Sequence, residues 1–360
     1  MNKDIVNNKS ALVAMSGGVD STTAALLSIR DGYECEGAVL RLFAQTDNGN
    51  ADVAEDALLA CKQLEIPLHI FDMCEYFETE VISPFIATYM SGRTPNPCVL
   101  CNKYLKFGYL IEKMRELGKN HLITGHYARI QDDGAGRFLL KKGLDATKDQ
   151  SYMLYTLKQE QLAVSRFPLG ELTKTHVREL AASEGLKNAN KKESQDICFI
   201  PHGNYSSFIE SYTGQQSTKG RFVYFDGSDL GENNGIIHYT VGQRRGLGLA
   251  LAHPPYVIEI RPNDNTVVIG KNEQLFSTSL LARDINFIPF DKLDTDLRAW
   301  AKIRYGHKEQ RATIRQLDND CLHIQFDEAQ RAIAKGQAVV IYDGDVVIGG
   351  GTIDHIDNVD

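Results

Sequence analysis

The chain has 360 residues, a length that allows two or three domains. Its formal net charge of −8 excludes a general polyanion binder, so contacts with nucleic acid must be confined to local basic patches. The polar amino terminus and the absence of a long apolar run argue against a signal peptide and a membrane helix, which predicts a cytoplasmic protein without a membrane partner. Seven cysteines, an odd number, fit a reducing compartment better than a disulfide framework.

A short apolar run, Ala11–Met15, is followed by a glycine turn and then by a helical period over Thr22–Arg30. The pattern predicts a strand, a turn and a helix. In the turn, Ser16–Ser21, two glycines let the backbone approach a ligand, and two serines add hydroxyl donors beside the positive end of the helix. We therefore expect a phosphate-binding loop. It is not the GxxxxGK[ST] loop, because no lysine follows the second glycine, and an ordinary strand-to-helix turn is the alternative.

The next segments alternate between strand and helix patterns. A second buried strand is predicted over 36–43, a polar turn over 45–50, a helix over 51–64 and a third strand over 68–71. This alternation predicts a doubly wound parallel sheet in an α/β domain, with ligands bound beyond the carboxyl ends of the strands. Leu40 ends the second strand and is a candidate adenine neighbour, although plain core packing explains it at least as well.

Further along the chain we expect a strand running into a turn at 122–127, a helix over Met153–Leu162 and another helix that begins at Thr173. From about Asn204 the pattern changes to short strands, which predicts a small mostly-β module followed by a compact β-barrel. The predicted domains are 1–205, 206–277 and 278–360. The module's strands are predicted at 220–225, 236–241, 256–260 and 266–269, and those of the barrel at 302–304, 311–315, 321–326, 338–342 and 346–348.

Three of the seven cysteines are candidates for chemistry. The other four, Cys35, Cys61, Cys74 and Cys321, are interpreted as packing residues. Cys98 and Cys101 form a C-x₂-C pair after the proline-rich loop 94–97, and Cys198 follows 97 residues after Cys101 (198 − 101). We expect Lys103 and Lys106, beside the pair, to favour thiolate. The residues alone leave open half a zinc site, a redox pair, a nucleophile with a distant partner cysteine, and three ligands of an iron–sulfur cluster.

The hexapeptide SGGVDS resembles the pyrophosphate loop of the N-type ATP pyrophosphatases, which adenylate a substrate and release pyrophosphate. Together with GRTPNPCVLCNKYLKF, ITGHYARI, DATKDQSYMLYTL, SQDICFI, YTVGQRRGLGL, RYGHK and KGQAVVIY, in this order, it resembles the bacterial tRNA-specific 2-thiouridylases from Ala11 to Gly351. The resemblance implies a sulfurtransferase that adenylates the C2 oxygen of the wobble uridine (U34) of tRNA and replaces it with sulfur.

The same resemblance implies residue roles. Cys198 would carry sulfur as a persulfide, and Cys101 would act as the nucleophile, freeing sulfide or closing a Cys101–Cys198 disulfide. Asp20 would lie near Mg²⁺ that accompanies ATP. The implied ATP contacts are Ala14, Met15, Ser16, Gly17, Gly18, Val19, Asp20, Ser21, Leu40 and Gly125. The implied target-base contacts are Asn96, Pro97 and Cys98, and the implied tRNA contacts are His126, Lys148, Asp149, Gln150, Arg304, Tyr305 and Gln337. The expected partners are tRNAs of the Lys, Glu and Gln type and an upstream protein sulfur donor.

The sequence departs from the family pattern at Cys98, where the family often has aspartate, and at 41–43, which makes base contacts there less secure. A third thiol favours an alternative in which Cys98, Cys101 and Cys198 hold a [4Fe–4S] cluster that carries the sulfide. Two other functions stay open: an ammonia-using adenylating synthetase, and a nucleotide-sensing RNA-binding protein without turnover. Basic loops at 243–246 and 302–315 are further candidate RNA contacts, with a solvated surface as the simpler explanation.

Overall fold

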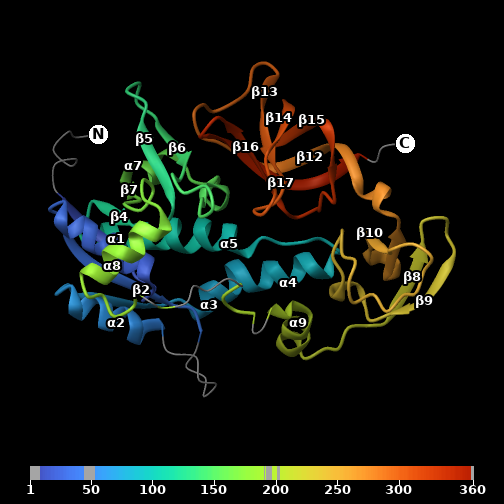
Figure 1. Ribbon diagram of the computed structural model, residues 1–360, viewed down its shortest axis with the longest axis horizontal. Helices are drawn as coiled ribbons and strands as arrows, with labels where there is room; N and C mark the ends of the chain where they lie inside the picture. Colours follow the sequence, from blue (N-terminus) through green and yellow to red (C-terminus); the bar gives the residue numbers. More distant parts are fainter. Residues whose placement is uncertain (1–8, 44–52, 190, 192–196, 201–202, 358–360) are drawn as a thin grey trace. The chain divides into compact units, whose positions relative to one another are not determined.

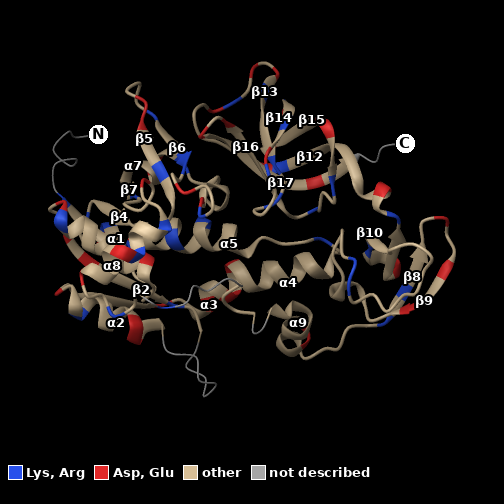
Figure 2. Ribbon diagram, viewed as in Figure 1, with Lys and Arg blue, Asp and Glu red and all other residues tan. Residues whose placement is uncertain are grey.

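A computed structural model describes residues 9–43, 53–189, 191, 197–200 and 203–357 (Figure 1). Its contacts divide the chain into two compact units. The first unit comprises Met1–Val81, Cys98–Glu193 and Gly344–Ile348, and the second comprises Ile82–Pro97, Ser194–Asp343 and Gly349–Asp360. Basic and acidic residues are interspersed along the strands of both units (Figure 2). Among the residues that the structure describes, no helix has the length and apolarity needed to cross a bilayer. The three predicted domain boundaries stay a prediction.

The first unit is built on a five-stranded sheet in the order β3-β2-β1-β4-β7, and all its pairings are parallel. The strands are β1 (Ser10–Ala14), β2 (Glu34–Arg41), β3 (Leu68–Asp72), β4 (His121–Ile123) and β7 (Ser165–Arg166). In central β1, the neighbouring residues Leu12 and Val13 point to opposite faces and are both fully buried, so both faces of the sheet are covered. The strand order reverses beside β1, where doubly wound sheets bind ligands. The predicted α/β fold is confirmed.

The helices that belong to or enter the first unit are α1 (Val19–Arg30), α2 (Val53–Gln63), α3 (Cys74–Phe77), a π-helix (Glu78–Ile82), α5 (Pro97–Leu100), a π-helix (Cys101–Tyr109), α6 (Leu110–Glu116), a 3₁₀-helix (Ser151–Leu154), α7 (Gln159–Val164) and α8 (Lys174–Ser183). The helix predicted to begin at Thr173 is confirmed, since the Thr173 hydroxyl accepts a hydrogen bond from the His176 amide at 3.3 Å. The single helix predicted over Met153–Leu162 is wrong. Lys158 is extended, and Gln161 accepts from its amide at 2.9 Å, so a new helix begins there.

A hairpin of β5 (Ala128–Asp132) and β6 (Phe138–Lys142) extends the first unit and was not predicted. The Asp133 carboxylate closes its turn by accepting from the amides of Ala135 and Arg137 at 2.7 and 3.0 Å. Lys141 of β6 pairs with Val346, which explains why a short segment from the end of the chain belongs to this unit. The predicted turn at 45–50 lies outside the described residues.

The second unit contains a four-stranded sheet in the order β10-β11-β8-β9. Its elements are α4 (Ser83–Met90), α9 (Tyr205–Thr213), β8 (Gly220–Tyr224), β9 (Asp229–Asn233), a 3₁₀-helix (Ile236–His238), β10 (Tyr256–Arg261), a 3₁₀-helix (Pro262–Asp264), β11 (Thr266–Gly270) and a 3₁₀-helix (Asn272–Leu275). Two expectations are wrong. The change to strands at Asn204 is wrong because Asn204 caps a helix, its side chain accepting from the Ser207 amide at 3.1 Å. The strand predicted at 236–241 is a helical turn, since the adjacent Ile236 and Ile237 are both buried and do not alternate.

A closed six-stranded antiparallel barrel completes the second unit, in the order β12-β15-β14-β13-β16-β17, and β12 pairs with β17 to close it. The strands are β12 (Phe276–Phe287), β13 (Leu297–Lys302), β14 (Gln310–Asp318), β15 (Cys321–Arg331), β16 (Ala338–Asp343) and β17 (Val346–Asp357). The predicted barrel is confirmed. The strand predicted at 302–304 instead ends at Lys302, and β12 was missed because three polar residues, Ser277–Ser279, interrupt its apolar pattern.

Candidate active site

The loop Ser16–Ser21 connects the end of β1 to the start of α1, as predicted. The Ser21 hydroxyl accepts from the Ser16 amide and lies 3.1 Å from the Ser16 hydroxyl, which folds the loop back on itself. Gly17 has φ +66°, and a Cβ atom there would lie 2.2 Å from the Asp56 Cβ, so only glycine fits. The loop is therefore fixed by local hydrogen bonds and by close contact with α2.

The amino terminus of α1 can bind an anion. Gly18 is its N-cap residue and has no side chain, so it offers no capping oxygen to the first-turn amides. Those amides and the helix dipole favour a phosphate group. Gly125, which follows β4, lies against this helix start, because a Cβ there would be 2.8 Å from the carbonyl carbon of Asp20. The structure thus brings Gly125 and Ser16–Ser21 together, and their roles as ATP contacts stay a prediction.

Asp20 is held by two residues that sequence reasoning missed. The Lys174 ammonium donates to both carboxylate oxygens at 2.7 and 2.8 Å, and the Tyr127 hydroxyl donates to one of them at 2.7 Å. Lys174 is only 8% exposed, whereas the Asp20 side chain is 32% exposed, so solvent reaches the carboxylate side of this ion pair. The predicted Mg²⁺ role of Asp20 stays a prediction, and in this structure its carboxylate orients Lys174 beside the loop Ser16–Ser21.

Asn188 is a third residue that was missed. Its side-chain amide donates to the Gly17 carbonyl at 3.2 Å and to the Thr22 hydroxyl at 2.7 Å. The loop is thereby braced from the segment that follows α8, 171 residues away in sequence. A polar residue of this kind carries no local motif, and only the folded chain reveals the contact.

The predicted tRNA loop 148–150 is linked to the same network. Gln150 accepts from the Tyr127 amide at 3.0 Å, while the Tyr127 hydroxyl reaches Asp20. Asp149 accepts from the Gly143 and Ser151 amides at 3.0 and 3.1 Å, and Lys148 is half-buried beside them. Both acidic and amide side chains therefore shape the loop. Contacts of these residues with tRNA stay a prediction.

Two other predicted residues lie in the first unit with different surroundings. Leu40 is the penultimate residue of β2 and is partly exposed. His126 is buried between the rings of Phe107 and Phe167, and its Nδ1 lies 2.6 Å from the Thr124 hydroxyl. Burial, with Lys106 nearby, holds the pKa of His126 well below its usual range. The imidazole is therefore neutral, and its proposed tRNA contact is untested.

Cys98 and Cys101 occupy one helical segment, which changes from α- to π-helical pairing at Cys101. Such π-helical insertions often occur at functional sites. Solvent reaches Cys98, but the surrounding protein desolvates both thiols and raises their pKa, and Lys106 only partly opposes this effect. Lys106 therefore acts in the predicted direction, but desolvation is the larger effect and the net shift of the pKa disfavours the thiolate. Lys103 instead lies 5.0 Å from the centre of the Tyr104 ring.

The third cysteine of interest, Cys198, is exposed and belongs to the second unit, so its approach to Cys101 stays a prediction. Cys35, Cys61 and Cys321 are buried and Cys74 is partly buried, in line with packing roles. Within the described ranges, no group of three His, Cys, Asp or Glu side chains is placed to hold a metal ion.

The loop that carries Asn96 and Pro97 is anchored inside the second unit. The Gln337 side chain donates to the carbonyls of Thr94 and Pro95 at 3.2 and 2.8 Å, and the Thr94 amide donates to the Lys335 carbonyl at 2.8 Å. Gln337, predicted to contact tRNA, thus holds the predicted target-base loop in place.

Arg304 and Tyr305 follow β13. Arg304 donates to the carbonyls of Val241 and Ala332 at 3.2 and 2.7 Å, whereas Tyr305 is exposed, with the Lys302 ammonium 5.5 Å from the centre of its ring. Tyr305 therefore has the exposure that a base-stacking residue needs, and Arg304 shapes the surface beneath it.

Sequence comparisons match almost the whole chain. Residues 9–202 match the tRNA methyl transferase HUP domain, residues 206–271 the tRNA methyl transferase PRC-barrel domain, and residues 277–353 the aminomethyltransferase beta-barrel domain. The tRNA-specific 2-thiouridylase MnmA of Lachnoclostridium phytofermentans is 44% identical over 354 residues, covering 96% of this chain and 99% of that protein. The chain belongs to the tRNA-specific 2-thiouridylase family.

Other members of the tRNA-specific 2-thiouridylase family match equally well. MnmA 2 of Clostridium botulinum strain Langeland is 46% identical over 346 residues, covering 96% of this chain and 98% of that protein, and MnmA of Carboxydothermus hydrogenoformans is 44% identical over 361 residues, covering 98% and 99%. Among solved structures, the U34-tRNA thiolase NcsA of Methanococcus maripaludis with its [4Fe-4S] cluster has a TM-score of 0.35 and 18% identity over 59% of this chain and 69% of that one. That likeness is too low to carry its cluster over to this chain.

Proposed function

We propose that this protein is an ATP-dependent tRNA sulfurtransferase that converts the wobble uridine of tRNA to 2-thiouridine. Family membership, at 44–46% identity over nearly the full length, is the observation that carries the proposal. The described residues fit ATP, since the amino terminus of α1 offers uncapped amides beside a glycine that cannot be replaced without a clash. The proposed substrates are ATP with Mg²⁺ and tRNAs of the Lys, Glu and Gln type, in the cytoplasm.

The first proposed step activates the uracil. The C2 oxygen attacks the α-phosphorus of ATP, an oxygen–phosphorus bond forms, and pyrophosphate leaves with the electron pair. The loop Ser16–Ser21 would hold the phosphates, and Lys174, kept in place by Asp20, would offset the negative charge that develops on pyrophosphate. The base must leave the anticodon stack to reach Asn96, Pro97 and Cys98, at a cost of a few kcal/mol.

The second proposed step transfers sulfur. The terminal sulfur of a Cys198 persulfide attacks C2, a carbon–sulfur bond forms, and AMP leaves with the oxygen. The terminal sulfur is then bonded to both Cys198 and C2. The Cys101 thiolate attacks the Cys198 sulfur, the sulfur–sulfur bond breaks, and the 2-thiouridine leaves with the electron pair, which leaves a Cys101–Cys198 disulfide. A two-electron thiol reductant restores both thiols, and a protein sulfur donor renews the persulfide. Because desolvation raises the pKa of Cys101, little of its thiolate exists at neutral pH, and its attack should be slow there unless bound tRNA changes its surroundings.

Two alternatives keep part of this chemistry. In the first, Cys98, Cys101 and Cys198 hold a [4Fe–4S] cluster that supplies sulfide. The spacing of Cys98 and Cys101 on one helical segment suits two ligands of such a cluster. In the second, ammonia replaces sulfur, which would require neither Cys101 nor Cys198. Both alternatives retain the ATP site and differ in the atom delivered to C2 or in its carrier.

The deciding experiment incubates the protein with ATP, Mg²⁺, a protein persulfide as sulfur donor, a thiol reductant and unmodified tRNA, and analyses the tRNA nucleosides by mass spectrometry; a parallel reaction with sulfide in place of the persulfide tests the cluster route. We expect 2-thiouridine together with stoichiometric pyrophosphate. Iron and acid-labile sulfide are measured on the same anaerobic preparation. An iron-free, colourless and fully active enzyme would exclude the cluster, and pyrophosphate release without any thiolated nucleoside would contradict sulfur transfer.

A further inference from the structure

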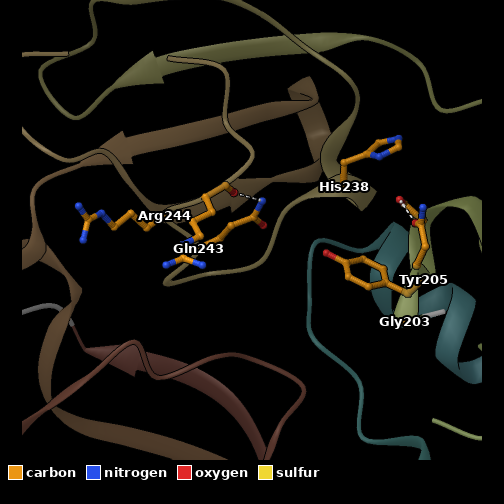
Figure 3. Close-up of a pocket in the computed structure, with 8 residues that line it drawn as sticks. Gly203, Tyr205, His238, Gln243 and Arg244 are labelled. Carbon is orange, nitrogen blue, oxygen red and sulfur yellow. Dashed lines mark hydrogen bonds between the residues drawn. The ribbon is translucent and has the colours of Figure 1, made fainter. Parts of the chain in front are cut away.

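We propose that a cavity on the second unit binds one nucleotide of the substrate tRNA, with Arg244 and Arg245 contacting its flanking phosphates. This inference rests on the proposed function, because the proposed function identifies the RNA as tRNA. The cavity has a volume of about 680 Å³, which is of the size that small-molecule ligands occupy. Figure 3 shows Gln243 and Arg244 on one side of it, and Tyr205 and His238 on the other.

The charges of this unit single out the two arginines. Arg244 and Arg245 are exposed, and within the described ranges neither guanidinium has a hydrogen-bond or ion-pair partner. Most other arginines of the unit have a carboxylate partner, namely Arg93, Arg221, Arg261, Arg283, Arg298 and Arg315. In an acidic protein with a net charge of −8, two adjacent unpaired guanidiniums are a local anion-binding feature.

The loop that presents these arginines is held rigid. The Gly242 amide donates to the Val257 carbonyl of β10 at 2.8 Å, and the Val257 amide donates to the Gln243 main-chain carbonyl at 2.9 Å. The Gln243 side chain accepts from the Thr240 amide at 3.0 Å and donates to the Arg245 carbonyl at 3.1 Å. The arginine backbone is thus fixed before any ligand binds, which reduces the entropy lost on binding.

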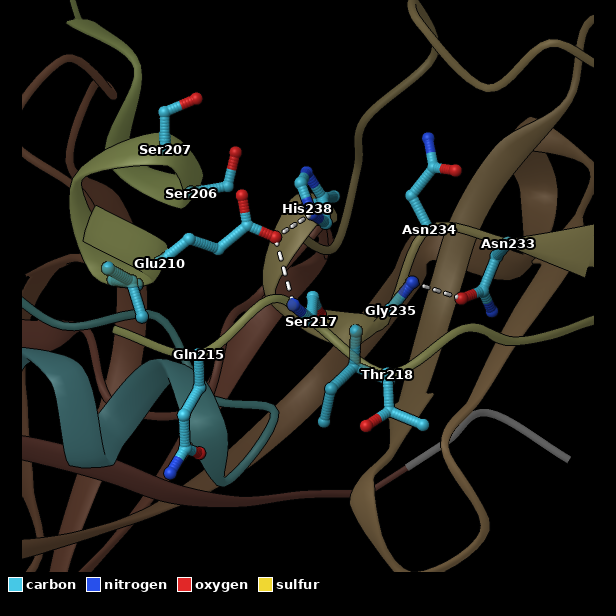
Figure 4. A network of polar contacts seen from close by, with 12 residues as sticks. Ser206, Ser207, Glu210, Gln215, Ser217, Thr218, Asn233, Asn234, Gly235 and His238 are labelled. Atoms are coloured by element: carbon cyan, nitrogen blue, oxygen red, sulfur yellow. Dashed lines mark hydrogen bonds and ion pairs between the residues drawn. The ribbon is translucent and has the colours of Figure 1, made fainter. Parts of the chain in front are cut away.

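The same network reaches the opposite wall. The Tyr205 hydroxyl lies 3.2 Å from the Thr240 hydroxyl, and its ring stacks on Tyr89 with centroids 4.4 Å apart. On the same wall, His238 Nε2 lies 3.3 Å from the Glu210 carboxylate, which also accepts from the Ser217 amide at 3.0 Å (Figure 4). The Glu210 carboxylate thus contacts Ser217 and His238, and within the described ranges it forms no ion pair with Arg244 or Arg245.

These groups match the chemistry of a nucleotide in an RNA chain. Arginines bind phosphate oxygens, aromatic and imidazole rings pack against a base or ribose, and the histidine and tyrosine offer polar atoms at their edges. A free mononucleotide has the same chemistry, but it carries phosphate on one side only. Two guanidiniums without partners among the described residues can each bind one phosphate, so a nucleotide with a phosphate on each side, as in tRNA, uses both of them.

The test compares two double variants in the full-length protein. Arg244→Gln with Arg245→Gln removes the proposed phosphate contacts. Arg221→Gln with Arg261→Gln is the matched control, because these exposed arginines of the same unit pair with Asp229 and Glu259. Each pair changes the formal charge from −8 to −10 (−8 − 2). The dissociation constant for tRNA is measured between about 50 and 200 mM salt, and that for ATP with Mg²⁺ at one salt concentration.

We expect the Arg244/Arg245 variant to lose about tenfold in tRNA affinity at low salt, and its log–log salt slope to fall by about 1.4 to 1.8, the value for two phosphates. The control and the ATP affinity should stay within about twofold. Equal losses in both double variants, or an unchanged slope, would overturn the proposal, as would lost ATP affinity with intact tRNA binding. Thiolation by the wild-type protein is scored separately, so failure of the proposed function is distinguishable from failure of this site.

Discussion

The thiols of Cys98 and Cys101 show two opposing effects at the scale of single residues. Desolvation raises the pKa of both, and the Lys106 charge lowers it by a smaller amount. A raised pKa means that the thiolate fraction at a given pH is below that of an ordinary thiol, so reactivity should keep rising as the pH increases beyond the usual thiol range. Sequence reasoning expected the lysines to dominate, because proximity is visible in a sequence and desolvation is not.

We predict that Lys106→Met slows alkylation of Cys98 and Cys101 by iodoacetamide at pH 8 and moves the pH profile of both thiols upward. The charge that opposes desolvation is lost, so the pKa of each thiol rises further. Alkylation of each cysteine is followed by mass spectrometry across pH. Lys103→Met is the control, since this exposed lysine lies over the Tyr104 ring. A profile that moves equally in the control would show that Lys106 has no specific effect.

Gly17 offers a second test at this scale. Gly17→Ala should destabilise the protein by about 3 kcal/mol and abolish ATP binding, because the left-handed backbone and a clash with Asp56 act together. Gly32→Ala is the matched control, with φ +83° but open space around its Cβ, and should cost about 1 kcal/mol. Urea unfolding and ATP titration measure both. Equal costs in the two variants would mean that the clash with Asp56 is relieved by small shifts.

The residues around Gly17 show which parts of the candidate site can be predicted from the sequence and which cannot. The loop Ser16–Ser21 was predicted because its residues are contiguous and its glycines and serines form a pattern typical of a phosphate-binding turn. Lys174 and Asn188 were missed, since they reach the loop from 154 and 171 residues away and belong to no recognisable motif. Contacts of this kind are set by packing of α8 and the segment after it, which no local pattern encodes.

At the scale of elements, the loop before Cys98 depends on the turn between β15 and β16. The Gln337 side chain satisfies the Thr94 and Pro95 carbonyls, which two prolines leave without a regular partner. A Cβ on the neighbouring Gly336 would lie 2.9 Å from the Thr94 carbonyl oxygen, so the loop and the turn fit closely. The position of the predicted target-base residues Asn96 and Pro97 is therefore set by the barrel.

We predict that Gln337→Leu increases hydrogen exchange at the Thr94 amide and slows thiolation about tenfold at saturating ATP. Two carbonyls lose their donor, at roughly 1 to 2 kcal/mol, and a shifted loop misplaces the target base. Gln325→Leu is the control, because Gln325 also donates to a main-chain carbonyl of the barrel, that of Thr278. Unchanged exchange at Thr94 would show that the Lys335 carbonyl alone holds the loop.

The elements that sequence patterns missed share a physical cause. In β12 and at the start of α9, polar residues have structural roles that hydrophobic periodicity does not reveal. Ser277 and Ser279 are buried within β12, and Asn204 caps α9. In contrast, β1 and α1 were predicted from their apolar spacing, and α8 from apolar spacing together with its cap residue Thr173. The turn Ile236–His238 was misread as a strand because a run of apolar and β-branched residues does not reveal a left-handed glycine before it, Gly235 at φ +98°.

At the scale of the whole molecule, the proposed chemistry divides between the units, since the predicted ATP loop Ser16–Ser21 lies in the first and Cys198 in the second. We predict that Cys198→Ser abolishes 2-thiouridine formation but leaves tRNA-dependent pyrophosphate release within about twofold, because serine cannot carry a persulfide. Nucleoside mass analysis and a pyrophosphate assay measure the two steps. Cys74→Ser, at a partly buried packing cysteine, should retain both activities.

A loss of pyrophosphate release in Cys198→Ser, with Cys74→Ser intact, would contradict this separation of roles. It would mean that the segment around Cys198 is needed before sulfur transfer, in binding the tRNA or in completing the adenylation site. The two outcomes therefore distinguish a sulfur carrier from a residue that also builds the first site.

The division into units has a consequence for how this protein can be dissected. The polypeptide passes between the units five times, after Val81, Pro97, Glu193, Asp343 and Ile348. No single truncation of the chain can therefore yield either unit intact, and the carboxyl-terminal barrel cannot be deleted without removing Gly344–Ile348, which belongs to the first unit. Chain termination at any point before Gly344 should therefore remove parts of both units at once.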